Sequence, residues 1–289
     1  MAIRVSPLTV AAVSNSFRPE VISAAFDAGC QTKLDTLHVF EVIESTNTFL
    51  ARQSVPTGQL HAAVAAQQTA GRGRGGKRWL SPPGASLCLS LACSFSRLPE
   101  QLPALTLSVG VGLARQIESL LDLPVQLKWP NDLILNNGKL GGILTELSSS
   151  GASSQIVVGV GINCELPADF SDTMEPRAEF PAVDLQSTDR EVVDFDRSVL
   201  AGALLAACAT AINTFVEEGL RPFVSDYISR DCLCGREVTV QNKGKDTQGI
   251  ARGIDASGAL LVDAGQGPLL AISSGSVELT KSLSSGAVR

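Results

Sequence analysis

The chain has 289 residues, 44% of them hydrophobic and 18% charged, which suits one large domain and a smaller one rather than a single small core. Its net charge of −6 argues against broad binding along a nucleic acid, and no apolar run reaches the roughly 20 residues that cross a bilayer. Seven scattered cysteines and only two histidines indicate reduced thiols in a cytoplasmic protein without a structural zinc site.

The elements predicted along the chain alternate between strands and helices, after an irregular or partly helical extension at 1–34. Hydrophobic patterning predicts strands at 37–43, 60–68, 85–95, 124–129, 132–137, 139–147 and 155–164, and helices at 48–53, 105–122, 198–218 and 222–229. Asn137-Gly138 predicts a type I′ hairpin turn, and residues 148–154 and 165–190 are predicted loops. After Arg230, five short runs separated by Gly, Asn and Asp turns predict a small β-barrel.

Basic side chains are concentrated in one stretch of the chain. Between Ser45 and Pro99 there is no Asp or Glu but there are six Lys and Arg, so the rest of the chain carries a charge of −12. A basic stretch on an acidic protein favours a local anionic ligand. Its centre is GRGRGGKRW, residues 71–79.

This glycine-rich stretch is similar to three phosphate-binding patterns but lacks their contexts. A dinucleotide fingerprint and a P-loop each open a helix, whereas a Ser-Pro-Pro-Gly run follows here at 81–84. Arg78 stands where a P-loop has Ser or Thr, and a single copy between two buried strands is unlike a disordered RNA-binding tail. The stretch therefore predicts a cradle in which glycines let the backbone approach an anion closely.

Further polar clusters interrupt the apolar strands. KWPND, residues 128–132, contains one of the two tryptophans and the glycine stretch ends with the other, which suggests stacking on a flat ring, with core filling as the alternative. Lys139, before Gly141-Gly142, either contacts a ligand or is an ordinary solvated lysine. Asn163 either forms hydrogen bonds with buried backbone groups or contacts the edge of a ligand. No catalytic triad or carboxylate pair stands out, so the site is predicted to act by positioning and electrostatics, as nucleotidyl transfer does.

Together, QQTAGRGRGGKRW, KWPNDLIL, GKLGGILTEL and GVGINC closely resemble, in order and spacing, the motifs of biotin protein ligases. ESTN upstream and the GREVTV…GIARGIDASGALLV segment extend the resemblance from residue 37 to about residue 280. The resemblance implies an α/β (α+β) fold with three parts. These are an N-terminal extension at 1–34, a mixed-sheet catalytic domain at 35–230 related to class II aminoacyl-tRNA synthetases and lipoate ligases, and an SH3-like β-barrel at 231–289.

The resemblance also implies a reaction. Biotin's carboxylate attacks the α-phosphate of Mg-ATP to give biotinyl-5′-AMP and pyrophosphate, and a lysine of a biotin carboxyl carrier protein then attacks this anhydride and releases AMP. ATP, biotin and Mg²⁺ are thus expected, with no metal held by the protein alone. A monomer or homodimer is expected, and sequence-specific DNA binding is not, because no winged helix-turn-helix pattern precedes the motifs.

The site residues implied by the resemblance follow from the motifs, position by position. Arg74 and Lys139 would be the catalytic pair that holds biotin's carboxylate and the α-phosphate. The biotin side would comprise Ser45, Thr46, Asn47, Gln68, Arg72, Gly73, Arg74, Lys139 and Gly142. The nucleotide side would comprise Arg74, Lys77, Arg78, Trp79, Lys128, Asn131, Asp132 and Asn163.

Two positions depart from the family pattern, since Gly75 and Lys77 stand where arginines are common, which bears on the affinity for the adenylate. The alternatives are a lipoate or octanoate ligase on the same fold, a nucleic-acid-binding protein, and a catalytically inactive biotin sensor. GRGRGG with KWPND favours biotin over lipoate, and the acidic remainder argues against nucleic acid. The presence of Arg74, Lys128 and Lys139 argues against an inactive sensor.

Overall fold

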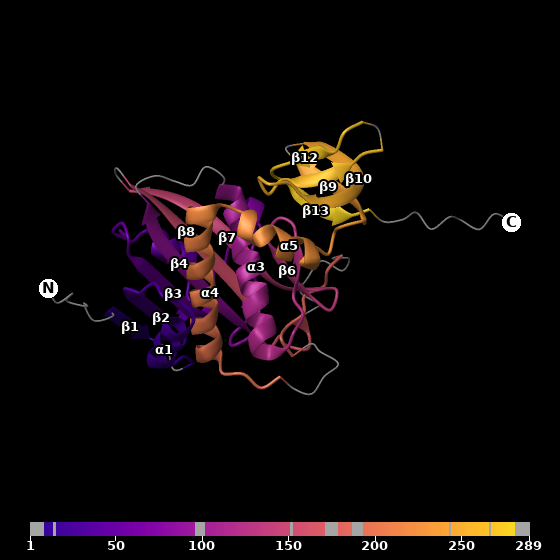
Figure 1. Cartoon of the computed structure of the whole chain (residues 1–289). Helices are drawn as coiled ribbons and strands as arrows, with labels where there is room; N and C mark the ends of the chain where they lie inside the picture. The colour runs from indigo at the N-terminus through magenta and orange to yellow at the C-terminus, as the bar shows by residue number, and fades with distance from the viewer. Residues whose placement is uncertain are drawn as a thin grey trace.

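The computed structural model describes residues 9–13, 16–95, 102–150, 153–170, 179–186, 193–242, 244–265 and 267–280. These residues form two sheets (Figure 1). The large sheet has eight strands in the order β1-β2-β3-β4-β8-β7-β6-β5, and the small one has five in the order β12-β11-β10-β9-β13. The predicted fold class, a mixed-sheet α/β domain followed by a small β domain, is confirmed.

The large sheet is parallel at one end and antiparallel over the rest. The parallel strands are β1 (Thr9–Val13), β2 (Thr36–Ile43) and β3 (Leu60–Gln68). The antiparallel part continues through β4 (Ser86–Phe95), β8 (Ser153–Asn163), β7 (Gly138–Ser150), β6 (Asp132–Leu135) and β5 (Gln126–Lys128). Nearly every residue of β4 is buried, which is why its sequence is a continuous apolar run rather than an alternating one.

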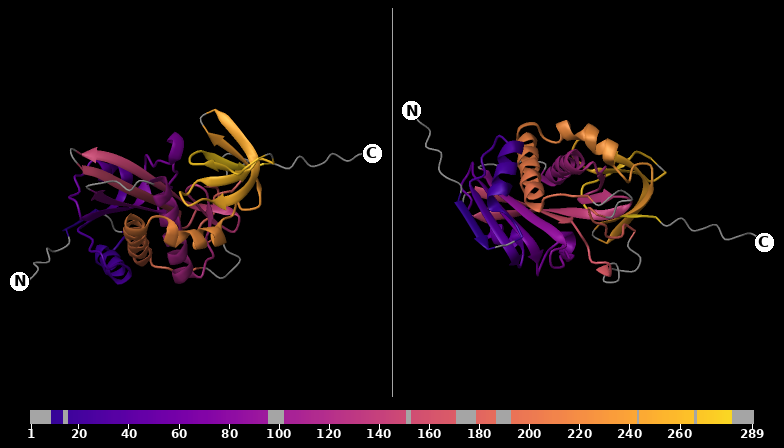
Figure 2. Two further views of the ribbon diagram at one scale, coloured as in Figure 1. Left: turned by 45° about the horizontal axis from the view of Figure 1, so that its top comes forward. Right: turned by 90° about the horizontal axis from the view of Figure 1, so that it is seen from below.

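Most helices cover one face of this sheet (Figures 1 and 2). α1 (Pro19–Gly29) packs against α4 (Arg197–Glu218), α4 packs against α3 (Leu102–Leu121), and α5 (Val224–Arg230) leads to the small sheet. The short α2 (Thr46–Ala51) lies on the opposite face, where Leu50 is buried in a second apolar cluster with Ala63, Ala92 and Val157. The sheet face beside α2 is the one that carries the predicted site residues.

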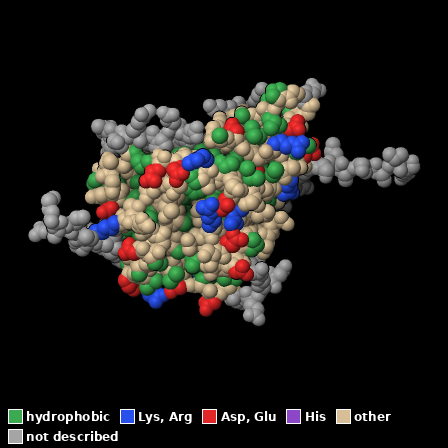
Figure 3. All heavy atoms as spheres, viewed as in Figure 1, with side chains coloured by type: hydrophobic (Ala, Val, Ile, Leu, Met, Phe, Trp, Pro, Cys, Tyr) green, Lys and Arg blue, Asp and Glu red, His purple; other side chains and the backbone are tan. Residues whose placement is uncertain are grey.

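The helix α4 is a core helix despite its composition. By length and composition it is apolar enough to cross a membrane, which the sequence analysis did not anticipate, but 67% of its most apolar window is buried inside the protein. Asp196 caps it by accepting the N–H groups of Ser198 and Val199, and Gly219 ends it with φ of +69°, as predicted. On the face that carries α3 and α4, acidic and basic side chains are interspersed with apolar ones (Figure 3).

The small sheet is antiparallel, and its five strands agree with the five predicted runs. They are β9 (Glu237–Asn242), β10 (Lys245–Ile254), β11 (Leu260–Asp263), β12 (Leu270–Ile272) and β13 (Ser276–Leu279). It is joined to the end of β5 by side-chain hydrogen bonds. Lys128 Nζ donates to Val277 O at 2.7 Å, and Trp129 Nε1 donates to Gly258 O at 3.0 Å. The KWPND segment therefore lies at the junction of the two sheets.

The hairpin turn between β6 and β7 lies one residue earlier than predicted. Leu135 pairs with Gly138, so the turn residues are Asn136 and Asn137, which have φ of +47° and +58°, as a type I′ turn requires. Gly138 is needed for another reason. A Cβ there would lie 2.2 Å from a methyl carbon of Val183, so the glycine lets residues 181–183 pack against the strand.

Two further expectations about local structure were wrong. The predicted loop at 148–154 is largely strand, because β7 continues to Ser150 and β8 begins at Ser153. In the segment 1–34, α1 bears out the helical part, but β1 adds a strand to the sheet that was not predicted. Residues 1–8 and 14–15 of that segment, and 171–178 and 187–190 of the predicted loop 165–190, lie outside the described residues.

Candidate functional site

The glycine-rich stretch forms a loop that folds back on itself after β3. Gly73 N–H donates to Lys77 O at 2.7 Å, and Trp79 N–H donates to Gly71 O at 3.0 Å. Gly75, at the crest, has φ of +63°, which an L side chain adopts only with strain. The glycine that departs from the family pattern therefore suits the conformation of this loop.

The loop borders a pocket of about 600 Å³. The pocket is lined by Ala70, the loop residues 71–78, and Leu144 and Glu146 of β7. One side of the pocket is thus the cationic glycine loop, and the other is the strand that carries Leu144 and Glu146. Lys77 and Arg78 have exposed side chains on the outer part of the loop, whereas Arg74 is half-buried.

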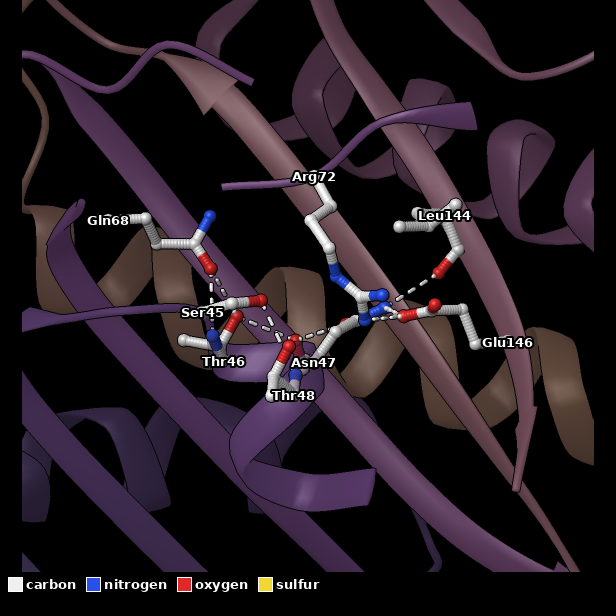
Figure 4. A network of polar contacts seen from close by, with 9 residues as sticks. Ser45, Thr46, Asn47, Thr48, Gln68, Arg72, Leu144 and Glu146 are labelled. Carbon is white, nitrogen blue, oxygen red and sulfur yellow. Dashed lines mark hydrogen bonds and ion pairs between the residues drawn. The ribbon is translucent and has the colours of Figure 1, made fainter. Parts of the chain in front are cut away.

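The start of α2 supplies the polar wall next to this pocket (Figure 4). Ser45 accepts the N–H of Thr48 at 3.3 Å and so caps the helix. The N–H and hydroxyl of Thr46 both donate to Gln68 Oε1, at 2.7 and 3.1 Å. Three residues predicted for the biotin side, Ser45, Thr46 and Gln68, therefore lie together, and Ser45 serves the capping role that was the alternative.

Asn47 is held by partners from two strands, β7 and β4. Its Nδ2 donates to Leu144 O at 3.1 Å and to Glu146 Oε2 at 2.9 Å, and Ser90 Oγ lies 2.6 Å from its Oδ1. Arg72 donates to the same Glu146 oxygen at 2.7 Å (Figure 4). We call Arg72, Glu146, Asn47 and Ser90 the Glu146 network.

Two glycines of β8 make room for site residues. A Cβ at Gly159 would lie 2.1 Å from Asn47 Oδ1, and a Cβ at Gly161 would lie 2.5 Å from the ring of Trp79. Asn163 of the GVGIN motif was a predicted site residue, but no role was predicted for these glycines. Their alternation in a buried strand was the available signal, because glycine in a strand interior marks the close approach of another group.

Arg74 and Lys139 both lie near Asp132. Lys139 Nζ donates to Asp132 Oδ1 at 2.7 Å, and a Cβ on Gly142 would lie within 3.8 Å of that ammonium. Burial lowers the pKa of Arg74, while the charge of Asp132 raises it. Lys139 therefore forms an ion pair with this half-buried carboxylate, and Arg74, which lines the loop pocket, is near enough to be affected by its charge.

The remaining nucleotide-side candidates mostly bind backbone groups. Asn131 Nδ2 donates to Ile143 O at 3.0 Å, and Asn163 Nδ2 donates to Lys139 O and Val183 O at 3.3 and 2.9 Å. Lys128 contacts the small sheet and lies 5.1 Å from the ring centre of Phe180. These residues fit the alternative in which they shape the site rather than line the loop pocket.

The buried cysteine next to the site is unsuited to nucleophilic chemistry. All seven cysteines are free, and burial raises the pKa of Cys88, which lies 3.6 Å from Ser81 Oγ and near Trp79 and Gln68, to about 11. A thiol of that pKa is protonated at neutral pH and a poor nucleophile. Within the described ranges, no three or more His, Cys, Asp or Glu side chains group as metal ligands.

Known proteins share both parts of this architecture. The biotin/lipoate A/B protein ligase family matches residues 39–163, and the biotin protein ligase C-terminal domain matches residues 233–280. The bifunctional ligase/repressor BirA of Salmonella typhimurium is 36% identical over 85% of this chain and 75% of its own. The biotin–[acetyl-CoA-carboxylase] ligase of Mycobacterium tuberculosis is 33% identical over 81% of this chain and 85% of its own.

A solved structure agrees with these relatives. Biotin protein ligase from Aquifex aeolicus in complex with biotin and ATP superposes with a TM-score of 0.69 and 27% identity, over 84% of this chain and 99% of that one. The mixed-sheet domain, its glycine-loop pocket and the small β domain thus define a ligase. The chain belongs to the biotin protein ligase family.

Proposed function

We propose that the protein activates biotin as biotinyl-5′-AMP and transfers it to a lysine of a biotin carboxyl carrier protein. The observation that carries this proposal is that Arg74 lines the glycine-loop pocket and is affected by the charge of Asp132, the carboxylate with which Lys139 forms an ion pair. Two cations near a single carboxylate leave positive charge for a second anion. Biotin's carboxylate and the α-phosphate repel one another, and such a pair of cations would reduce that repulsion.

In the first step, an oxygen of biotin's carboxylate forms a bond to the α-phosphorus of ATP, and the bond from that phosphorus to the bridging oxygen breaks. Pyrophosphate leaves with the electron pair. In the second step, the carrier lysine's amine attacks the acyl carbon of the anhydride, AMP leaves with the electron pair, and the amine loses a proton. Arg74 and Lys139 would stabilise the charge on the phosphoryl oxygens in both steps.

The roles of the other residues follow from their positions. Ser45, Thr46 and Gln68 are proposed to bind the ureido ring of biotin, with the backbone at Arg72 and Gly73. Lys77, Arg78 and Trp79 are proposed to contact the nucleotide from the outer part of the loop. Lys128, Asn131, Asp132 and Asn163 are proposed to shape the nucleotide side through the strands that they brace.

Mg²⁺ is proposed to arrive with ATP. Because no group of three or more metal-ligating side chains occurs in the described residues, the phosphates would supply most of its ligands, and Asp132 is a candidate for a protein ligand. Magnesium typically binds proteins in this way, through one or two carboxylates and substrate phosphates. We further propose a cytoplasmic monomer or homodimer without sequence-specific DNA binding.

The test is ATP–pyrophosphate exchange measured with biotin, with lipoate and with no added acid. We expect exchange that depends on biotin, followed by transfer to a purified carrier domain. Exchange that depends on lipoate alone would identify the lipoate ligase instead. Biotin binding without any exchange would identify an inactive sensor.

A further inference from the structure

Glu146 has no role in the proposed chemistry, yet three parts of the pocket meet at its side chain. It lies on β7, two residues beyond Leu144, and its side chain is 27% exposed. A single oxygen, Oε2, accepts both the guanidinium of Arg72 at 2.7 Å and the amide of Asn47 at 2.9 Å (Figure 4). One atom therefore connects the glycine loop, α2 and the sheet.

The Asn47 side of this connection is rigid. Asn47 is buried, its two amide hydrogens are used by Leu144 O and Glu146, and its oxygen faces the hydroxyl of Ser90. Rotating the amide would place its oxygen against two other acceptor oxygens. The Asn47 side chain packs against the backbone of Gly159 and fills the space that a Cβ there would need. Glu146 is thus held in place from this side.

The glycine-loop side is weakly tied. The backbone hydrogen bonds within residues 71–79 close the loop on itself rather than onto the sheet. Trp79 anchors the end of the loop by its packing over Gly161. The ion pair between Arg72 and Glu146 ties the first half of the loop to the sheet.

We propose that Glu146 is a positioning residue that holds the glycine loop closed over the pocket, an inference that rests on the proposed biotin ligation. The Arg72 side chain is 48% exposed, and an ion pair so open to solvent is weak. It opens readily enough to admit biotin and ATP. Once the adenylate has formed, the same pair slows its escape before the carrier lysine arrives.

The test uses Glu146→Gln, which keeps an oxygen for Asn47 but removes the charge that attracts Arg72. In the ligand-free variant, we expect faster amide hydrogen exchange over residues 71–79 than in the wild type. Release of preformed biotinyl-5′-AMP, chased with excess biotin, should be about two- to fivefold faster, the range expected for a solvent-exposed ion pair. Single-turnover adenylation at saturating biotin and ATP should change less than twofold.

A matched control and a double variant separate this role from general damage. Glu165→Gln removes a carboxylate that pairs with Arg197 at 3.8 Å and is 73% exposed, and it should change neither measurement. Arg72→Gln should speed hydrogen exchange over residues 71–79 as Glu146→Gln does, and the double variant should exchange no faster than either single one, because both changes remove the same pair. Multiplied effects in the double variant would refute the proposal.

The two proposals fail differently. Unchanged hydrogen exchange over 71–79 in Glu146→Gln, with biotin activation intact, would overturn the role of Glu146 alone. Absence of biotin-dependent pyrophosphate exchange in the wild type would overturn the ligase reaction, and with it adenylate retention.

Discussion

Arg74 differs from the neighbouring cations of the glycine loop in its surroundings. It is half-buried and near Asp132, whereas Lys77 and Arg78 are exposed and Arg72 is paired with Glu146. Arg74 is partly removed from water, and the carboxylate near it already pairs with Lys139. Such a guanidinium can bind an incoming phosphate strongly. Arg74 is therefore the loop cation whose loss should matter most to adenylation.

Arg74→Ala should slow single-turnover adenylation roughly 10- to 150-fold, the equivalent of one charge-assisted hydrogen bond. The dissociation constant of biotin should change less, because the ureido ring is bound elsewhere and the lost contact strengthens toward the transition state. The control is Arg221→Ala, since that side chain is 84% exposed and pairs only within its own turn, with Glu218. Equal, small effects in the two variants would show that Arg74 is an ordinary solvated residue of the loop.

Gly161→Ala should damage the site without touching a polar group. The added methyl would lie 2.5 Å from the Trp79 ring, so the ring and the end of the glycine loop must move. We expect at least a tenfold loss of adenylation, roughly 1.4 kcal/mol or more, as overpacking commonly costs. Gly110→Ala is the matched control, because its methyl would meet its nearest atoms at 3.4 and 3.5 Å, which are ordinary contacts. Normal adenylation by Gly161→Ala would show that Trp79 does not depend on this glycine.

The sequence singles out residues that lie in motifs and is silent on those that only packing brings together. The glycine loop stands out by its composition and Lys139 by its place before Gly141-Gly142, and a pocket borders the loop. Glu146 and Ser90 were missed because their partners are 74 and 43 residues away in sequence. No local pattern distinguishes a strand glutamate that accepts two hydrogen bonds from one that faces water.

At the scale of elements, apolar patterning predicted most strands and helices, whereas pairing between distant segments was harder to foresee. β1 has only five residues and exists by parallel pairing with β2, 27 positions further on. A segment that short carries little periodicity, so its strand character was invisible. The hairpin turn was misplaced because a strong local signal was misleading. Asn-Gly is a typical turn pair, but here Gly138 is needed for packing, because Val183 approaches it closely.

The turn assignment can be tested through Asn137. Because Asn137 has φ of +58°, alanine should destabilise the protein by roughly 1 kcal/mol, while glycine should cost nothing or stabilise it slightly. Urea unfolding of Asn137→Ala and Asn137→Gly measures both. If the turn were centred on Asn137-Gly138, Asn137 would still need positive φ but so would Gly138, and Gly138→Asn would then be tolerated. We expect Gly138→Asn to be severely destabilising, since its Cβ would overlap Val183.

At the scale of the whole molecule, the junction between the sheets involves the KWPND motif directly. Lys128 and Trp129 both donate to carbonyls of the small domain, and Glu179 accepts the N–H of Leu279 at 2.8 Å. Cys232 N–H donates to Leu127 O at 3.0 Å, so the chain enters the small domain along β5. The sequence predicted the boundary near residue 230 but not these contacts, because they join residues that are at least 100 positions apart.

Asp231, at this junction, should make stability depend on pH in a predictable direction. Its Oδ1 accepts the N–H of Leu233, but its Oδ2 is shielded from solvent without a hydrogen-bond partner among the described residues. Burial raises the pKa of Asp231, so the ionised form is disfavoured in the folded protein. The unfolded carboxyl ionises first, near pH 3.9. The stability that the neutral carboxyl contributes is present below that pH and is lost as the pH rises through the folded pKa.

Asp231→Asn cannot ionise and should escape this loss. The free energy of unfolding of this variant, measured in urea, should therefore increase relative to that of the wild type as the pH rises from about 3.5 to 7. Asp226→Asn is the control of opposite sign, since a hydrogen bond from Arg115 lowers the pKa of Asp226. Over the same pH range, the free energy of unfolding of the wild type should increase relative to that of Asp226→Asn. The increase should be small, because the Arg115–Asp226 pair is partly exposed. Parallel pH profiles for the wild type and Asp231→Asn would mean that water reaches the Asp231 carboxylate, and that the junction of the two sheets opens readily in solution.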